Sequence, residues 1–153
     1  MAEVNFPYTV KVKLPSDLEV IPPVRKFISE VLQVSGFSAK FAFRSEVIVD
    51  AICNNAITHG NGSDADSEIE VRMVVYADRV EVVVKDKGGS AVHLERLKDA
   101  VCKEKTPLTA CETAGMGLEI VKLLSETIEL SVDENNVTSI HVVRKREDAA
   151  QAP

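Results

Sequence analysis

The sequence has little of what marks several specialised classes of protein. Tryptophan is absent, aromatic residues make up 5%, and glycine and proline number only 7 and 6, which excludes fibrous and low-complexity proteins. The three cysteines are an odd number without a CxxC pair, which argues against a structural zinc site and fits a reduced, cytoplasmic protein. No apolar run approaches the about 18 residues of a membrane helix, and no basic and apolar leader opens the chain, so we expect neither a membrane span nor a signal peptide.

Basic residues are also in the minority. Lys and Arg number 18 against 24 Asp and Glu, which gives a net charge of −6. No basic run is present that would follow a phosphate backbone, so nucleic acid is not expected as a primary partner. The composition is that of a globular protein, since 45% of the 153 residues are hydrophobic and 27% are charged. A domain of this length buries enough surface to fold without a disulfide or metal.

Hydrophobic patterning predicts one α+β domain over residues 1–145, followed by a frayed tail over 146–153. The expected elements, in order, are a strand over 6–14, helices from after 17 to about 34 and from 38 to 59, a hairpin of strands 69–76 and 80–85, a helix over 118–125, and a hairpin of strands 127–132 and 138–144. Residues 86–114 are expected to form a long loop with one short helix around 94–102, and such a loop is usually a lid or binding loop. These elements predict a two-layer sandwich, in which one mixed, mostly antiparallel sheet is covered on one face by helices.

The helix predicted over 38–59 carries polar residues on its apolar face. At about 100° of rotation per residue, Phe41, Ile48 and Ile52 share one face, and Asn55 and His59 fall on it too. A buried asparagine costs a few kcal/mol unless its hydrogen bonds are met. Either this asparagine satisfies the frayed end of the helix, or it serves a ligand.

The segment Asp86–Ser90 directly follows a predicted strand. A carboxylate at a strand end can accept a hydrogen bond from an exocyclic amine, and Gly88 would let a flat ligand approach the backbone. An ordinary β-turn uses the same residue types and is the alternative interpretation.

Gly115, Met116 and Gly117 directly precede the helix predicted over 118–125. Two glycines at a helix start expose N–H groups where the helix dipole is positive, which favours phosphate binding. No Gly-Lys-Ser or Gly-Lys-Thr follows, so this is not a Walker loop, and the third glycine of a Rossmann fingerprint is missing. A flexible helix N-cap is the alternative.

Together, these features resemble the GHKL ATPase/kinase superfamily and, within it, the small bacterial anti-sigma factor serine kinases. The sequence Asn55-Ala56-Ile57-Thr58-His59-Gly60 matches the N box of that family. Asp86–Ser90 matches the first glycine box and Gly115–Leu118 the second. The resemblance covers roughly residues 6–145 and implies the GHKL (Bergerat) ATP-binding fold.

The resemblance implies a site for ATP or ADP with Mg²⁺. Asn55 would hold the Mg²⁺, as an oxygen ligand suited to a hard cation. Asp86 would accept a hydrogen bond from the adenine amino group, and Gly88 would let the base lie against the backbone. Thr138 stands where the family usually has Gly-Thr near the adenine, although Val137 replaces the glycine here.

The resemblance also implies how the phosphates would be held. The loop over 89–114 would be the ATP lid, and His59 would lie near the phosphate end. Backbone N–H groups of the second glycine box would bind the phosphates; these belong to Gly115, Met116, Gly117 and Leu118.

One position departs from the family pattern. In the kinases, a glutamate four residues before the metal-binding asparagine acts as general base, but here that position holds Ala51. The nearest carboxylate, Asp50, is rotated by about 100° and is the candidate catalytic base. Taking Asn54 as the metal ligand would restore the spacing to Asp50 but would turn the asparagine off the apolar face, so Asn55 is retained.

On this resemblance we expect a cytoplasmic anti-sigma factor with serine/threonine kinase activity. It would sequester a sigma factor as a homodimer and phosphorylate a serine of an anti-anti-sigma partner with a STAS domain. One alternative is an ATP-dependent partner-switching adaptor with weak or no kinase activity, which Ala51 favours. The other is a kinase that activates a stress-signalling phosphatase, which nothing in the sequence separates from the first.

Overall fold

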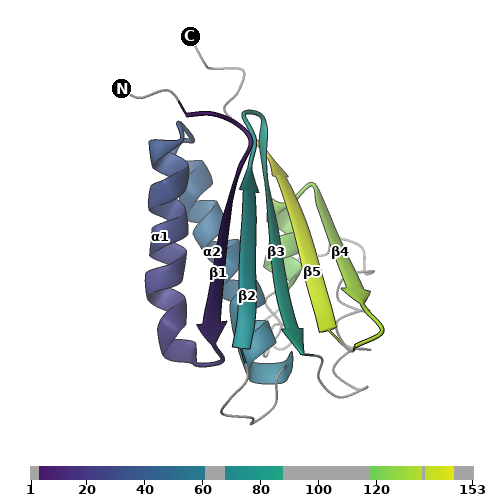
Figure 1. Ribbon diagram of the computed structural model, residues 1–153. Coiled ribbons are helices and arrows are strands. Elements are labelled where there is room, and N and C mark those ends of the chain that lie inside the picture. Colours follow the sequence, from purple (N-terminus) through teal and green to yellow (C-terminus); the bar gives the residue numbers. More distant parts are fainter. Residues whose placement is uncertain (1–3, 61–67, 88–117, 136, 147–153) are drawn as a thin grey trace.

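The computed structural model describes residues 4–60, 68–87, 118–135 and 137–146 of the chain. In these residues, three α-helices lie against one face of a single five-stranded sheet (Figure 1). The predicted α+β sandwich with helices on one face is therefore confirmed. None of the helices in the described ranges is long and apolar enough to cross a membrane.

The sheet contains β1 (Tyr8–Pro15), β2 (Glu68–Val75), β3 (Arg79–Lys87), β4 (Thr127–Val132) and β5 (Val137–Lys145). Their spatial order is β1-β2-β3-β5-β4, and every neighbouring pair is antiparallel. The described sheet is thus not mixed. The reason is that β4 lies at the edge of the sheet and does not pair with β3. Strand β5 returns by a hairpin and lies between them, so it is antiparallel to both.

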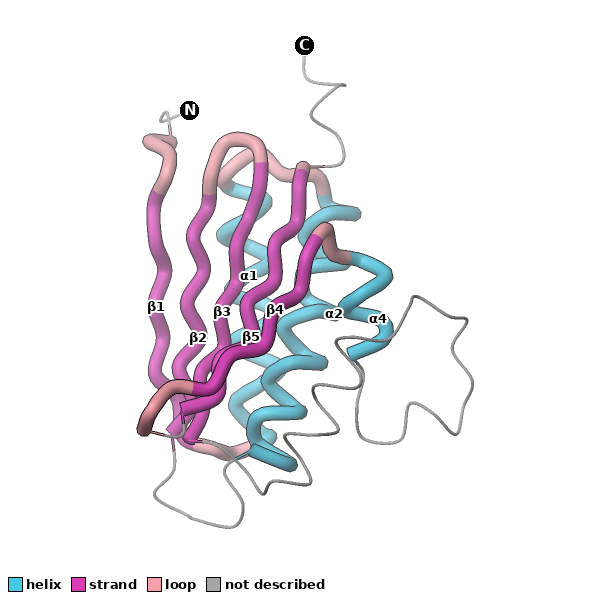
Figure 2. The backbone as a smooth tube through the Cα atoms, turned by 90° about the vertical axis from the view of Figure 1, so that its right-hand side faces the viewer, coloured by secondary structure: helices cyan, strands magenta, loops and turns pink. Residues whose placement is uncertain are grey.

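Three helices form the second layer, which Figure 2 shows beside the sheet. They are α1 (Ile21–Val34), preceded by a 3₁₀ turn η1 (Leu18–Val20), then α2 (Ala39–Asn55) and α4 (Leu118–Leu124). The Ser38 side chain caps α2 by accepting a hydrogen bond from the N–H of Phe41. Between α1 and α2, Gly36 has a φ of 94°, a conformation that other residues rarely adopt.

The core lies between α2 and the central strands. The helix-facing side of β3 carries Val80, Val82 and Val84, and that of β5 carries Ile140 and Val142. These pack with the buried face of α2, which includes Phe41, Ile48 and Ile52 as predicted. Because side chains alternate along a strand, Asp86 and Thr138 fall on this same covered side.

Several boundaries differ from the sequence prediction, and three of the differences change where a named residue lies. The α-helix expected to reach residue 59 ends at Asn55, and a wider π-helical turn, η2 (Ala56–Gly60), follows it. Strand β3 extends through Asp86 to Lys87, so this carboxylate lies inside the strand rather than after it. Residue 146, expected to be frayed, is held: the Arg146 N–H donates to the Asp78 carbonyl at 2.9 Å. The helix expected around 94–102 and tail residues 147–153 lie outside the described residues.

Candidate nucleotide-binding site

Asp86 and Thr138 form the polar end of the covered sheet face. They are paired in register across β3 and β5. Both are buried, with exposed fractions of 6% and 1%. Each continues an apolar stripe, so the sheet presents a carboxylate and a hydroxyl where the pattern would otherwise place two more core residues.

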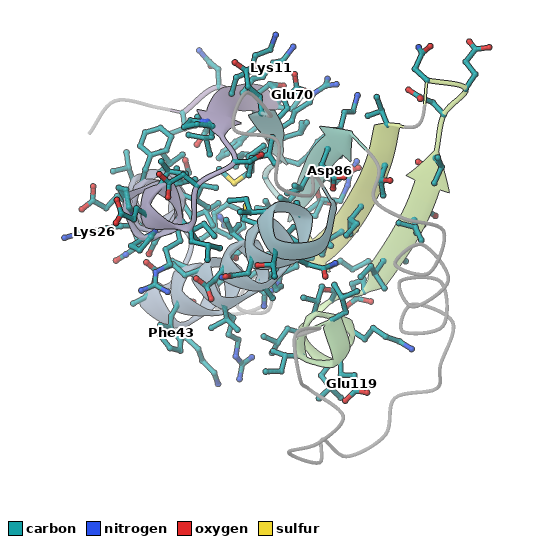
Figure 3. All side chains as sticks on the ribbon, turned by 90° about the horizontal axis from the view of Figure 1, so that it is seen from below. Lys11, Lys26, Phe43, Glu70, Asp86 and Glu119 are labelled. Carbon is teal, nitrogen blue, oxygen red and sulfur yellow. The ribbon has the colours of Figure 1, made fainter. Side chains whose placement is uncertain are left out.

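Asn55 lies at the same end of the fold. It is the last residue of α2 and only 2% exposed, as its place on the apolar face predicts. The η2 turn continues directly from it and packs against both α2 and β3. Figure 3 shows Asp86 beside this end of the helix layer.

The three side chains have one property in common. Asn55 Oδ1, Asp86 Oδ1 and Thr138 Oγ1 are all buried, and none has a hydrogen-bond partner in the described part of the chain. An unpaired buried polar atom costs about 1–3 kcal/mol, so native proteins rarely keep one without a reason. Three of them at one end of the sheet and α2 favour a ligand-binding site over a helix cap or a plain turn.

Burial also changes the acidity of the site. Removal of the Asp86 carboxylate from water raises its pKa to about 7. The carboxyl group therefore titrates near neutral pH, unlike an exposed aspartate. A ligand that donates a hydrogen bond to it would favour the charged form and so lower its pKa.

The donor set fits a magnesium nucleotide. Asn55 Oδ1 is a neutral oxygen of the kind Mg²⁺ accepts as a ligand. The described residues contain no group of three or more His, Cys, Asp and Glu side chains that could hold a metal ion. Mg²⁺ bound at Asn55 would therefore take most of its ligands from phosphates and water, as is usual for this ion at nucleotide sites.

The other predicted binding residues are only partly described. His59 lies in η2, the turn that packs against β3. Leu118 is the first residue of α4 and its side chain is fully buried. Gly88 of the first glycine box, and Gly115, Met116 and Gly117 of the second, lie outside the described residues, as does the lid segment 89–114.

Asp50, the predicted base, lies on a different face of α2 from Asn55. Its Oδ1 accepts a hydrogen bond from Arg25 Nη1 of α1 at 3.0 Å, in a partly exposed ion pair. This pair lines a surface groove between α1 and α2, together with Phe43 and Glu46. The position that shares a face with Asn55 is Ala51, which is half-buried against the core. This placement disfavours Asp50 as the base, although its role stays a prediction.

Comparisons with known proteins identify the family of the chain. Residues 14–142 match the family model of the histidine kinase-like ATPase domain. A relative named serine-protein kinase RsbW from Bacillus pumilus is 27% identical over 146 residues, which cover 90% of this chain and 87% of the relative. The Bacillus subtilis protein of the same name is 25% identical over 127 residues, covering 79% and 76% of the two chains.

Two solved structures share the fold. The RsbU and RsbW domains of a Mycobacterium tuberculosis protein align with a TM-score of 0.64 at 16% identity, over 90% of this chain and 32% of that one. The SiaB–SiaC complex of Pseudomonas aeruginosa gives a TM-score of 0.65 at 12% identity, over 89% of each chain. Since the family model spans most of the sequence, the protein belongs to the family of histidine kinase-like (GHKL-type) ATPase domains, to which the serine-protein kinases RsbW are related.

Proposed function

We propose that the protein binds ATP or ADP with Mg²⁺ at the end of the sheet formed by Asp86 and Thr138. The observation that carries this is the set of three buried oxygens without a partner in the described residues, on Asn55, Asp86 and Thr138. Asp86 accepts a hydrogen bond from the adenine amino group, and Thr138 contacts the same end of the nucleotide. Asn55 ligates the metal. Bound Mg²⁺ neutralises phosphate charge and aligns the phosphates.

We further propose that it is a cytoplasmic anti-sigma factor with serine/threonine kinase activity. It holds a sigma factor as a homodimer and transfers the terminal phosphate of ATP to a serine of an anti-anti-sigma STAS-domain partner. The support is its relatedness to several proteins named serine-protein kinase RsbW, at 27% and 25% identity in the two compared above. By the family resemblance, backbone N–H groups of Gly115 to Leu118 would bind the phosphates, His59 would lie near them, and Gly88 would let the base lie against the backbone.

A second candidate is an adaptor of the same fold that exchanges partners according to the bound nucleotide, with weak or no transfer. It is favoured by one observation: the α2 position on the face of Asn55 is Ala51, and the neighbouring carboxylate of Asp50 is bound to Arg25. A general base contributes typically about 10²–10⁴-fold, whereas metal and positioning supply much of phosphoryl transfer. The second candidate therefore differs from the first mainly in rate.

The experiment that tests the proposal uses the full chain, radiolabelled ATP with Mg²⁺, and each STAS-domain protein encoded near its gene. The kinase predicts label on one partner, lost when that partner's acceptor serine is changed to alanine and lost with Asn55→Ala. The adaptor predicts little or no label, but partner binding that differs between ATP and ADP in a pull-down. A sigma factor should be retained in the same pull-down and released by the unphosphorylated partner. Absence of nucleotide binding would contradict both candidates.

A further inference from the structure

The covered side of β5 ends in a charged residue rather than an apolar one. Arg144 continues the stripe of Thr138, Ile140 and Val142 and is only 3% exposed. Sequence patterning places it simply at the end of a strand. Burying a guanidinium is costly unless its donors are satisfied and its charge is compensated, so its contacts identify what the residue contributes.

Arg144 connects three elements of the fold. Its Nη1 donates to the Phe41 carbonyl at 3.0 Å and to Ser45 Oγ at 2.9 Å, both in the first half of α2. Its Nε donates to the carbonyl of Leu124, the last residue of α4, at 2.9 Å. The Ser45 hydroxyl also donates to the Phe41 carbonyl at 2.9 Å, which closes the network on the α2 side.

Two effects stabilise the cation in this place. The guanidinium lies over the Phe41 ring, 4.1 Å from its centroid, as a cation–π contact. The Leu124 carbonyl stands at a helix C-terminus, where the dipole is negative. An apolar side chain could fill this space at lower cost, but only a group with several fixed donors can join both helices to β5.

The two helices joined here carry opposite parts of the proposed nucleotide site. Helix α2 ends at Asn55, and α4 begins at Leu118, the last residue of the second glycine box. With only seven residues, α4 is about 10 Å long, and a helix this short is marginal without tertiary contacts. A shift of its last residue would tilt its first turn.

We propose that Arg144 is a positioning residue for the nucleotide phosphates. By holding the C-terminal residue of α4 against the first half of α2, it sets the backbone of Leu118 relative to Asn55. This inference rests on the proposed function, because it concerns how the proposed site binds phosphates. It makes no claim on the adenine end, where Asp86 and Thr138 are held by the pairing of β3 and β5.

The test compares a ligand that has phosphates with one that lacks them. Calorimetry would measure Kd for ADP with Mg²⁺ and for adenosine in wild type and Arg144→Met. We expect the ADP affinity to fall by about tenfold and the adenosine affinity to change by less than about twofold, because the adenine end is unaffected. Arg79→Met is the matched control. Arg79 also stacks on a ring, that of Tyr76 at 3.7 Å, but belongs to the uncovered face of β3, so neither affinity should change.

The outcomes separate the inference from the proposed function. Equal losses for ADP and adenosine, or no loss for either, in Arg144→Met would overturn the positioning role while nucleotide binding by wild type stands. Failure of wild type to bind either ligand would overturn both. If Arg144→Met does not fold, Ser45→Ala removes one acceptor and keeps the charge. It should weaken ADP binding by about two- to threefold with adenosine unchanged, and an unchanged ADP affinity would overturn the inference.

Discussion

Asp86 and Thr138 face one another in register across β3 and β5, and each buries an oxygen that has no partner in the described residues. On a sheet whose covered side is mostly apolar, this pair leaves polar groups where packing alone would favour apolar ones. If these oxygens bind the proposed nucleotide, the protein should be less stable without it. The burial of these two side chains should therefore lower the free energy of unfolding of the nucleotide-free protein, which can be measured.

The contribution of Asp86 to the free energy of unfolding should depend on pH. Burial raises the pKa of Asp86 to about 7, whereas in the unfolded chain it is about 4. Between these values the folded protein binds more protons than the unfolded chain, so the free energy of unfolding should fall as pH rises from about 4 to about 7. We expect Asp86→Asn to remove this dependence and to stabilise the nucleotide-free protein at pH 8 by about 1–3 kcal/mol.

Urea denaturation of wild type and Asp86→Asn at a series of pH values measures the effect. A constant difference between wild type and Asp86→Asn across this range would show that the carboxyl group does not titrate as described.

Asn55 should carry the metal dependence of nucleotide binding. In wild type, chelation of Mg²⁺ should weaken ADP binding, because the metal joins the phosphates to Asn55 Oδ1. In Asn55→Ala, the affinity with Mg²⁺ should fall to the level measured with a chelator. The matched control is Asn54→Ala, since the neighbouring Asn54 is partly exposed and its Nδ2 donates to the Asp50 backbone carbonyl at 3.0 Å. If the Mg²⁺ effect were lost in Asn54→Ala but kept in Asn55→Ala, Asn54 rather than Asn55 would be the metal ligand, which would contradict the assignment.

The catalytic base can be tested on α2. Since Asp50 is bound to Arg25 on the groove between α1 and α2, Asp50→Ala should leave phosphoryl transfer to a STAS-domain partner and ADP affinity nearly unchanged. Ala51→Glu places a carboxylate on the face of Asn55 and should raise the single-turnover rate, by up to about 10²-fold. A fall of about 10²–10⁴-fold in Asp50→Ala, with nucleotide affinity intact, would instead establish Asp50 as the base.

The parts of the fold that follow from local patterning were predictable. Alternating apolar residues identify β2 and β3, and the apolar face of α2 places Asn55 inside. The ends of elements were not, because the change from α-helix to the η2 turn after Asn55 keeps the next apolar residues buried and so leaves no break in the pattern.

Long-range pairings were also beyond the sequence. The Arg25–Asp50 ion pair depends on how α1 packs on α2, and the burial of Arg144 depends on acceptors from residues about a hundred positions earlier in the chain. A charged residue at a strand end is usually solvated, so its sequence position alone gives no sign of burial. Thr138, by contrast, was found through the family resemblance and lies opposite Asp86.

The most direct test of the account is the affinity of the full chain for ADP with Mg²⁺, measured by calorimetry in wild type and Asp86→Ala. The account predicts binding by wild type and a loss of about 1.5–3 kcal/mol in the variant, which is roughly ten- to hundredfold in Kd, because a hydrogen bond to a charged group is removed. Equal affinities in the two proteins, or no binding by wild type, would contradict the assignment of the nucleotide site to Asn55, Asp86 and Thr138.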